Sequence, residues 1–243
     1  MVTNTDNSDP LILAVETSGR LGSVALAQGN KLLSEKQFSG PLRHSAEIFP
    51  AITDLLSRFD KKPDQIEHIY ISAGPGSFTG LRISVTFAKT MALANGAKIV
   101  AVDTLDCITA NVNPQDKSEL LGVILDAKRG QFFIAVYEQT QDTRLKTPDS
   151  MWKKTLPDCL MTAEDFLARF SDRPIMLAGE GLVFYKDKFA HKNIRVLDEK
   201  FWNPSAANVH KLGWRLALQN QFADPLTLTP NYIRGPDVTV KQL

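Results

Sequence analysis

The chain has 243 residues, which allows one large domain or two compact ones. Hydrophobic residues make up 43% and charged residues 23%, which is ordinary for folded globular proteins and excludes wholesale disorder or a fibrous protein. The 28 basic and 27 acidic residues leave a formal net charge of +1, so no global positive field attracts a polyanion. If nucleic acid is bound, we expect local contacts or contacts made by a partner.

The cysteine content and the termini indicate a reduced, cytoplasmic setting. Cys107 and Cys159 form no C-x-x-C pair and no cluster with histidine. No run of residues approaches the ~18 consecutive apolar residues of a membrane span. The first ten residues lack the basic and apolar regions of a signal peptide, so we expect a flexible tail at 1–10 and no membrane partner.

The first half is expected to alternate strands and helices. Apolar residues recur at three- and four-residue spacing from His44 to Phe59 and predict a helix that Pro50 kinks or delays. A second helix is expected from about Leu81 to Asn95, and a short one capped by Thr104 is expected to reach about Asn111. Apolar runs between turn residues predict strands at 11–16, 23–27, 31–38, 66–73 and 98–102, the first two joined as a hairpin.

The second half is expected to open in the same way, with a hairpin of strands at 120–126 and 131–137. The polar stretch from Glu138 to Cys159 is expected to be irregular or to lie at an edge. A strand is expected at 175–178, with helices from Thr162 to about Phe170 and from Ser205 to Gln221. Two halves that each start with a hairpin predict an α/β fold with two mixed sheets, as in the duplicated actin-like ATPase fold.

One glycine-rich stretch is a candidate anion or nucleotide site. It reads Gly74-Pro75-Gly76-Ser77-Phe78-Thr79-Gly80 and precedes a helix, where backbone N–H groups attract anions. Neither the P-loop nor the dinucleotide fingerprint is present. The alternative is that the glycines permit a tight turn and close helix packing, and both readings stay open. The contacting residues would be Gly74, Gly76, Ser77, Thr79 and Gly80.

Glu16 and Thr17 end the first strand, at a place where a phosphate or metal-bound nucleotide can sit, although a solvated strand end is favoured for Glu16. Asp126 to Gly130 is expected to be a hairpin tip rather than a polar contact site. The four histidines are not spaced as metal ligands, and no G-x-S-x-G motif is present. No metal site and no catalytic residue are therefore predicted.

Several of these stretches together resemble the TsaB (formerly YeaZ) family, over nearly the full chain from about Leu11 to Arg234. The stretches are Leu13–Ser18, Arg43-His44-Ser45-Ala46-Glu47, Gly74–Arg82, Ala88-Lys89, Asp126–Gly130 and Pro230-Asn231-Tyr232-Ile233-Arg234. The resemblance implies two subdomains of actin-like ATPase fold, placed at 11–112 and 113–224 and followed by a C-terminal segment at 225–243.

The function implied by the resemblance is the formation of N6-threonylcarbamoyladenosine at position 37 of tRNAs that read codons beginning with A. Family members are non-catalytic partners of the catalytic subunit TsaD, and TsaE supplies an associated ATPase. TsaD-like proteins carry an H-x-x-x-H metal pair on the helix that corresponds to Thr104–Asn111, where this chain has no histidine. No intrinsic cofactor and no activity of the chain alone are expected; ATP and metal belong to the partner subunits, and tRNA contact is indirect.

The resemblance also implies where the partner binds. The helices of the first half would contact TsaD, or a second copy of the chain when TsaD is absent. An alternative from another class is a self-contained small-molecule kinase of the same fold, with Glu16, Thr17 and the glycine-rich loop around a magnesium nucleotide. A third, metallopeptidase, is weakened by the lack of paired histidines. The expected interface residues are Arg43, His44, Glu47, Phe78, Arg82, Phe87, Lys89 and Met91.

Overall fold

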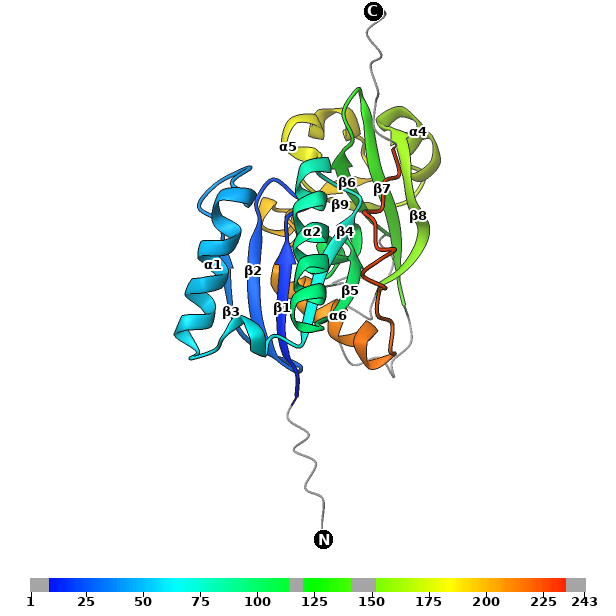
Figure 1. Ribbon diagram of the computed structural model, residues 1–243. Helices are drawn as coiled ribbons and strands as arrows, with labels where there is room; N and C mark the ends of the chain where they lie inside the picture. Colours follow the sequence, from blue (N-terminus) through cyan, green and yellow to red (C-terminus); the bar gives the residue numbers. More distant parts are fainter. Residues whose placement is uncertain (1–8, 114–119, 141–151, 235–243) are drawn as a thin grey trace, which may run out of the picture.

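The computed structural model describes residues 9–113, 120–140 and 152–234 (Figure 1). Most of the predicted tail at 1–10, residues 114–119, the centre of the 138–159 stretch and the chain after 234 lie outside these residues. No helix within the described ranges is long and apolar enough to cross a membrane.

Two five-stranded mixed sheets form the framework. The first has the order β3-β2-β1-β4-β5, with β1 (Leu11–Glu16), β2 (Ser23–Gln28), β3 (Lys31–Gln37), β4 (His68–Gly74) and β5 (Lys98–Asp103). The second has the order β10-β9-β6-β7-β8, with β6 (Leu120–Asp126), β7 (Gln131–Gln139), β8 (Trp152–Thr162), β9 (Ile175–Ala178) and β10 (Ile194–Val196).

The second sheet repeats the topology of the first. In each sheet the first three strands pair antiparallel in sequence order, the fourth pairs in parallel with the first, and the fifth pairs in parallel with the fourth. The predicted duplication, with a hairpin at the start of each half, is therefore confirmed. This repeated arrangement, with helices against the sheets, is the actin-like ATPase fold.

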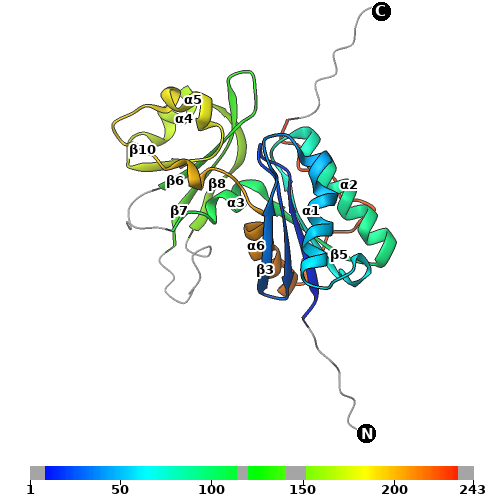
Figure 2. The same ribbon diagram turned by 90° about the vertical axis from the view of Figure 1, so that its left-hand side faces the viewer.

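Helices cover both faces of the first sheet (Figure 2). Side chains alternate along a strand, so Leu11 and Leu13 of β1 face a core shared with α1 (His44–Arg58) and α2 (Phe78–Asn95). Ile12 and Ala14 face the opposite core with α6 (Ala206–Leu218). Helix α6 thus follows the second sheet in sequence but packs on the first. The subdomain ranges proposed from the sequence stay a prediction.

The remaining helices are short. They are α3 (Thr104–Thr109), α4 (Ala163–Phe170) and α5 (Leu182–Tyr185), with 3₁₀ turns η1 (Pro63–Gln65), η3 (Lys186–Phe189) and η4 (Glu199–Phe201). Helix α4 starts at the predicted cap, because the Thr162 hydroxyl accepts a hydrogen bond from Asp165 N.

Helix α1 begins at His44, as predicted, so of the two effects expected of Pro50 the delayed start does not occur. Two local predictions were wrong. Helix α2 begins at Phe78 rather than Leu81, because the Ser77 hydroxyl accepts a hydrogen bond from Gly80 N and caps it. Helix α3 is capped by Asp103 and not by Thr104, which is itself helical; the Asp103 carboxylate accepts hydrogen bonds from the next free N–H groups.

The end of the stretch predicted to be irregular or at an edge is the edge strand β8. Pro157 is compatible with this strand because the ladder with β7 shifts register there, between the Ile134 and Val136 pairings. Proline is tolerated at such bulges, where no ladder hydrogen bond is required of it.

Candidate functional site

A cavity of about 700 Å³ lies between the two halves, at the carboxyl ends of the central strands. The β1–β2 turn contributes Gly19 and Arg20, and the β6–β7 turn contributes Asp126 to Arg129. Gly76 to Phe78 follow β4, and Glu180 follows β9 at the corresponding place of the second half. The strand topology repeats in the two sheets, so two pairs of corresponding loops surround one space: the β1–β2 and β6–β7 turns, and the loops that follow β4 and β9.

The glycine-rich stretch packs closely against the β1–β2 turn. A Cβ at Gly76 would meet the Ser18 carbonyl oxygen at 2.5 Å, and one at Gly80 would lie well inside contact distance of the Thr17 carbonyl oxygen. The Thr17 hydroxyl donates a 2.8 Å hydrogen bond to the Gly80 carbonyl. Gly74 has φ +122°, which favours glycine. These contacts give the glycines a packing role; Gly76 and Ser77 also line the cavity, whereas Glu16, Thr17, Gly74, Thr79 and Gly80 do not.

Glu16 is fully buried at the end of β1. Its Oε1 accepts hydrogen bonds from the Ser18 backbone and hydroxyl, both at 2.5 Å. Burial raises the pKa of Glu16, and the hydrogen bonds from Ser18 oppose that shift. Glu16 therefore shapes the turn that leads into the cavity and is not the solvated strand end favoured from the sequence.

His44 is also a core residue, with 4% of its surface exposed. Its Nε2 lies 3.0 Å from the Gly19 carbonyl, which can only accept, so Nε2 carries the proton. Burial lowers the pKa of His44. The side chain thereby fixes the start of α1 against the β1–β2 turn and does not lie on the outer face of the helix.

A C-terminal strap, residues 224–234, runs along α2 and reaches the second half. Lys89 donates to the Leu226 and Leu228 carbonyls, and Arg82 donates to the Tyr232 hydroxyl at 3.2 Å. The Arg82 guanidinium also lies 3.8 Å from the Phe78 ring centroid. Phe78, Arg82 and Lys89 were predicted as interface residues, and the structure places them against this strap.

The strap ends on the second hairpin. Asn231 N donates a 2.7 Å hydrogen bond to the Ala73 carbonyl of β4. Arg234 donates to the Ala127 carbonyl at 2.5 Å and to the Gln131 side chain. Residues 231–234 therefore form one wall of the cavity and join the first sheet to the β6–β7 turn.

Uncharged side chains gather on the outer faces of α1 and α2, next to Arg82 and Lys89 of α2, which contact the strap. On α1, Phe49 is 63% exposed and contacts the nearly buried Phe87 of α2 edge to face, and on α2 Leu93 is 72% exposed. Met91 is partly buried against the core. The surface, called here the α1/α2 face, consists of Ala46, Phe49, Pro50, Thr53, Ile83, Thr86, Thr90 and Leu93.

Charged residues lie at the flanks of the α1/α2 face and pair there. The Arg43 Nε lies 2.5 Å from the Glu47 carboxylate in an ion pair, and this carboxylate also accepts a hydrogen bond from the Ser39 backbone N–H. Asp54 pairs with both Lys36 and Arg58. The spacing of Arg43 and Glu47 was visible in the sequence, but Phe49 and Leu93 were missed as surface residues. The sequence signal that identifies Phe49 and Leu93 is that each apolar residue falls outside the three- and four-residue spacing of the buried positions of its helix.

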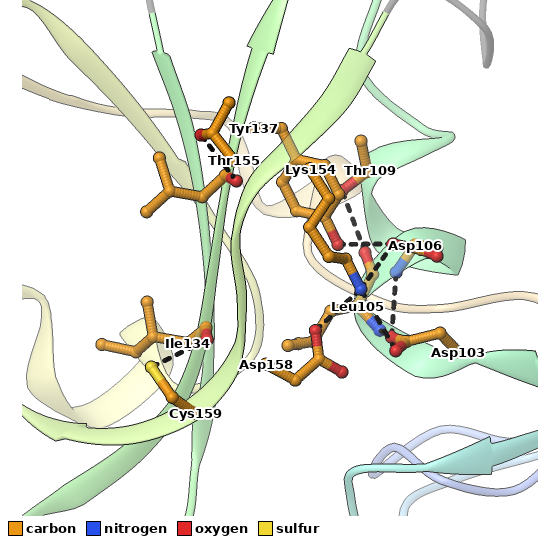
Figure 3. Close-up of polar contacts among 11 residues, drawn as sticks. Asp103, Leu105, Asp106, Thr109, Ile134, Tyr137, Lys154, Thr155, Asp158 and Cys159 are labelled. Atoms are coloured by element: carbon orange, nitrogen blue, oxygen red, sulfur yellow. Dashed lines mark hydrogen bonds and ion pairs between the residues drawn. The ribbon is translucent and has the colours of Figure 1, made fainter.

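A polar cluster joins α3 and the end of β5 in the first half to strands β7 and β8 of the second half (Figure 3). Lys154 of β8 places its Nζ 3.1 Å from Asp103, 2.9 Å from Asp106 and 2.7 Å from Asp158. The Tyr137 hydroxyl donates a 2.7 Å hydrogen bond to Asp106. Burial, together with the Asp158 carboxylate, raises the pKa of Asp103 to about 7. One ammonium thus holds three carboxylates, of which one gains a proton near neutral pH.

The cluster predicts a pH dependence of stability. The pKa of Asp103 is higher in the folded chain than in the unfolded one, so its contribution is full below about pH 4 and is lost as the pH rises to about 7. The variant Asp103→Asn keeps the helix cap. We expect its free energy of unfolding, relative to that of the parent, to increase by about 1 kcal/mol or more between pH 4 and pH 8. Urea unfolding at several pH values measures this gain. The exposed control Asp172→Asn is expected to show none, and an equal gain in both variants would contradict the assignment.

No group of three or more His, Cys, Asp or Glu residues in the described ranges is arranged to hold a metal ion. The α3 segment, where the resemblance places a metal pair in TsaD-like proteins, carries Asp106 and Cys107. Burial raises the pKa of the Cys107 thiol well above its usual value.

Comparisons with known proteins agree with this architecture. The family model described as TsaD, tRNA N6-adenosine threonylcarbamoyltransferase, matches residues 40–169. The chain is 29% identical over 235 residues to the tRNA threonylcarbamoyladenosine biosynthesis protein TsaB of Bacillus subtilis, covering 95% of this chain and 96% of that protein. The Haemophilus influenzae protein of the same name is 22% identical over 96% of both chains.

A solved structure of YeaZ from Pseudomonas aeruginosa superposes with a TM-score of 0.76 at 20% identity, covering 92% of this chain and 99% of that one, which supports the fold. The TsaD family model spans more than half of the chain. The chain therefore belongs to the TsaD family, and over nearly its full length it is similar to the TsaB (YeaZ) proteins.

Proposed function

We propose that this chain acts in the formation of N6-threonylcarbamoyladenosine at position 37 of tRNAs reading codons that begin with A. Its role is that of a non-catalytic subunit that binds a TsaD-like catalytic subunit, with a TsaE-like ATPase completing the complex. The names of its relatives, which are tRNA threonylcarbamoyladenosine biosynthesis proteins, support the pathway.

The observation that carries the pairing is the uncharged α1/α2 face, where Phe49 and Leu93 are exposed and the charged residues pair at the flanks. The cores of protein interfaces are depleted of charge and enriched in aromatic residues. The TsaD family model includes the stretch that forms α1 and α2. A TsaD-like subunit is therefore expected to carry a corresponding helix pair, and two such faces bury each other; alone, the chain pairs with a second copy through the same face.

The test is reconstitution with the TsaD-like and TsaE-like proteins of the same cell, unmodified tRNA, ATP and threonylcarbamoyl-adenylate. Nucleoside mass spectrometry of the tRNA is expected to find the modification with all three proteins and at least a tenfold lower rate when this chain is left out. The chain alone is expected to modify no tRNA and to turn over no ATP. Modification or ATP turnover by the chain alone would instead support the self-contained enzyme.

A further inference from the structure

The C-terminal strap is anchored mainly on the first half. Ala223, just before the strap, donates a 2.8 Å hydrogen bond to the Ile99 carbonyl of β5. The side chains of Ala223 and Leu228 pack against the core that α1 and α2 share with the first sheet. Asn231 N donates a 2.7 Å hydrogen bond to the Ala73 carbonyl of β4. A backbone bridge, apolar packing and hydrogen bonds thus hold the strap to this half over most of its length.

The last two described residues of the strap reach the second half. Ile233 is half-buried and packs against the core of that half. The Arg234 guanidinium donates to the Ala127 carbonyl at 2.5 Å and to the Gln131 side chain, which flank the tip of the β6–β7 hairpin. The strap therefore holds the second half by one apolar side chain and one guanidinium, far fewer contacts than it makes with the first half.

The chain itself crosses between the halves twice, at another place. It leaves the first sheet after β5 through α3, and it returns through residues 202–205 before α6. Asn111, just after α3, donates to the Phe201 carbonyl at 3.3 Å and to the Asn203 carbonyl at 2.8 Å. The Asn208 side chain of α6 donates a 2.6 Å hydrogen bond to the Asn111 side chain. Two crossings bonded side by side form a hinge, because a rotation about them leaves both intact.

The strap bridges the halves away from these crossings. Residues 231–234 line the cavity, whereas the three asparagines of the crossings do not. Figure 2 shows α3 between the two halves, and the strap, in red, ends near the start of α2. On the cavity side Arg20 N also donates to Glu180 of the second half at 2.8 Å, but this contact is a single hydrogen bond. A contact away from a hinge resists rotation about it, so the strap is placed to fix the angle between the halves.

We propose that the C-terminal strap is a releasable link between the two halves. While Ile233 and Arg234 are in place, the strap holds the halves in the observed arrangement; when these two residues detach, the second half turns about the crossings at Asn111. This end opens first because local opening starts where the fewest contacts must break. The proposal does not depend on the pairing with a TsaD-like subunit, because every contact lies within this chain.

Distances between two spin labels test the proposal in the full chain. The labels are attached to Ser57→Cys on α1 and Ala168→Cys on α4, which are exposed positions in different halves. Cys159→Ser removes the partly exposed native thiol, while Cys107 is buried. Dilution with unlabelled chain leaves only distances within one molecule. The parent is expected to give one narrow distance distribution, and a broad distribution in the parent overturns the proposal.

Variants of the strap release the link. Arg234→Ala is expected to at least double the width of the distance distribution without changing the far-ultraviolet circular dichroism, and adding Ile233→Ser is expected to widen it further. Arg234→Lys is expected to lie between the parent and Arg234→Ala, because an ammonium lacks the planar fork that reaches both acceptors. If the double variant does not fold, Arg234→Ala decides alone, since it removes no core side chain.

The matched control is Arg173→Ala with Val196→Ser. It removes an arginine and a partly exposed apolar side chain from the second half outside the strap, where Arg173 pairs only 3.4 Å from Glu138 of the same half. Its distance distribution is expected to equal that of the parent. An unchanged distribution in Arg234→Ala, which would mean that Arg20 and Glu180 or the crossings hold the halves without the strap, overturns the proposal. An equal broadening in the control also overturns it.

Discussion

Replacing Phe49 and Leu93 together with lysine is expected to lower the affinity for the TsaD-like partner at least a hundredfold. Both side chains are exposed in the isolated chain, so the fold tolerates the change. In the complex each lysine would be buried in an uncharged interface, and central aromatic or aliphatic contacts of this kind are worth about 2 kcal/mol or more each. Because such losses are not fully additive, we take a combined loss of about 3 kcal/mol, which corresponds to more than a hundredfold in the dissociation constant.

The matched control is Leu218→Lys, which changes a side chain of similar exposure, 65%, at the end of α6 on the opposite side of the first sheet. Calorimetry or interferometry with the purified partner is expected to find the control within twofold of the parent. Full affinity in the Phe49/Leu93 variant would place the interface elsewhere. Phe87 and Met91 are less suitable targets, because Phe87 is only 9% exposed and both side chains pack on the core.

Gly80→Ala is expected to lower the free energy of unfolding by about 3 kcal/mol, a cost at the upper end for overpacked sites. In an ordinary helix the same change stabilises by about 1 kcal/mol, so the sign is diagnostic. Here the new Cβ would collide with the Thr17 carbonyl oxygen and displace either the β1–β2 turn or the start of α2.

Gly40→Ala serves as the control, because a Cβ there meets only the Cδ atom of Arg43, at 3.9 Å. Chemical denaturation is expected to place this control within about 0.5 kcal/mol of the parent. A Gly80→Ala variant as stable as the parent would mean that the glycine is not needed for packing and would reopen its role as an anion contact.

The repeated fold was predictable because its signals are local. Apolar runs in the sequence predicted nearly every central strand. The two hairpins that open the halves were also predictable, because the strands of each are joined by a short turn. The prediction of the α3 cap was wrong because Asp103 and Thr104 are both good capping residues, and only the backbone geometry at the end of β5 selects Asp103.

The candidate sites were harder to predict because their contacts are distant in sequence. Arg82 meets Tyr232 across 150 residues, and Arg234 meets Ala127 across 107. Nothing near Lys89 in the sequence shows that its ammonium holds the C-terminal strap. The motif that contains Phe78 and Arg82 was recognisable, but the contacts that those residues make depend on the tertiary fold.

The most direct test of the partner-subunit account is the light-scattering mass of this chain on a sizing column, alone and mixed in equal amounts with the TsaD-like protein of the same cell. The account predicts a one-to-one complex in the mixture, and its loss when Phe49 and Leu93 are replaced by lysine but not when Leu218 is. Two separate peaks, with and without nucleotide and the TsaE-like protein, would contradict it.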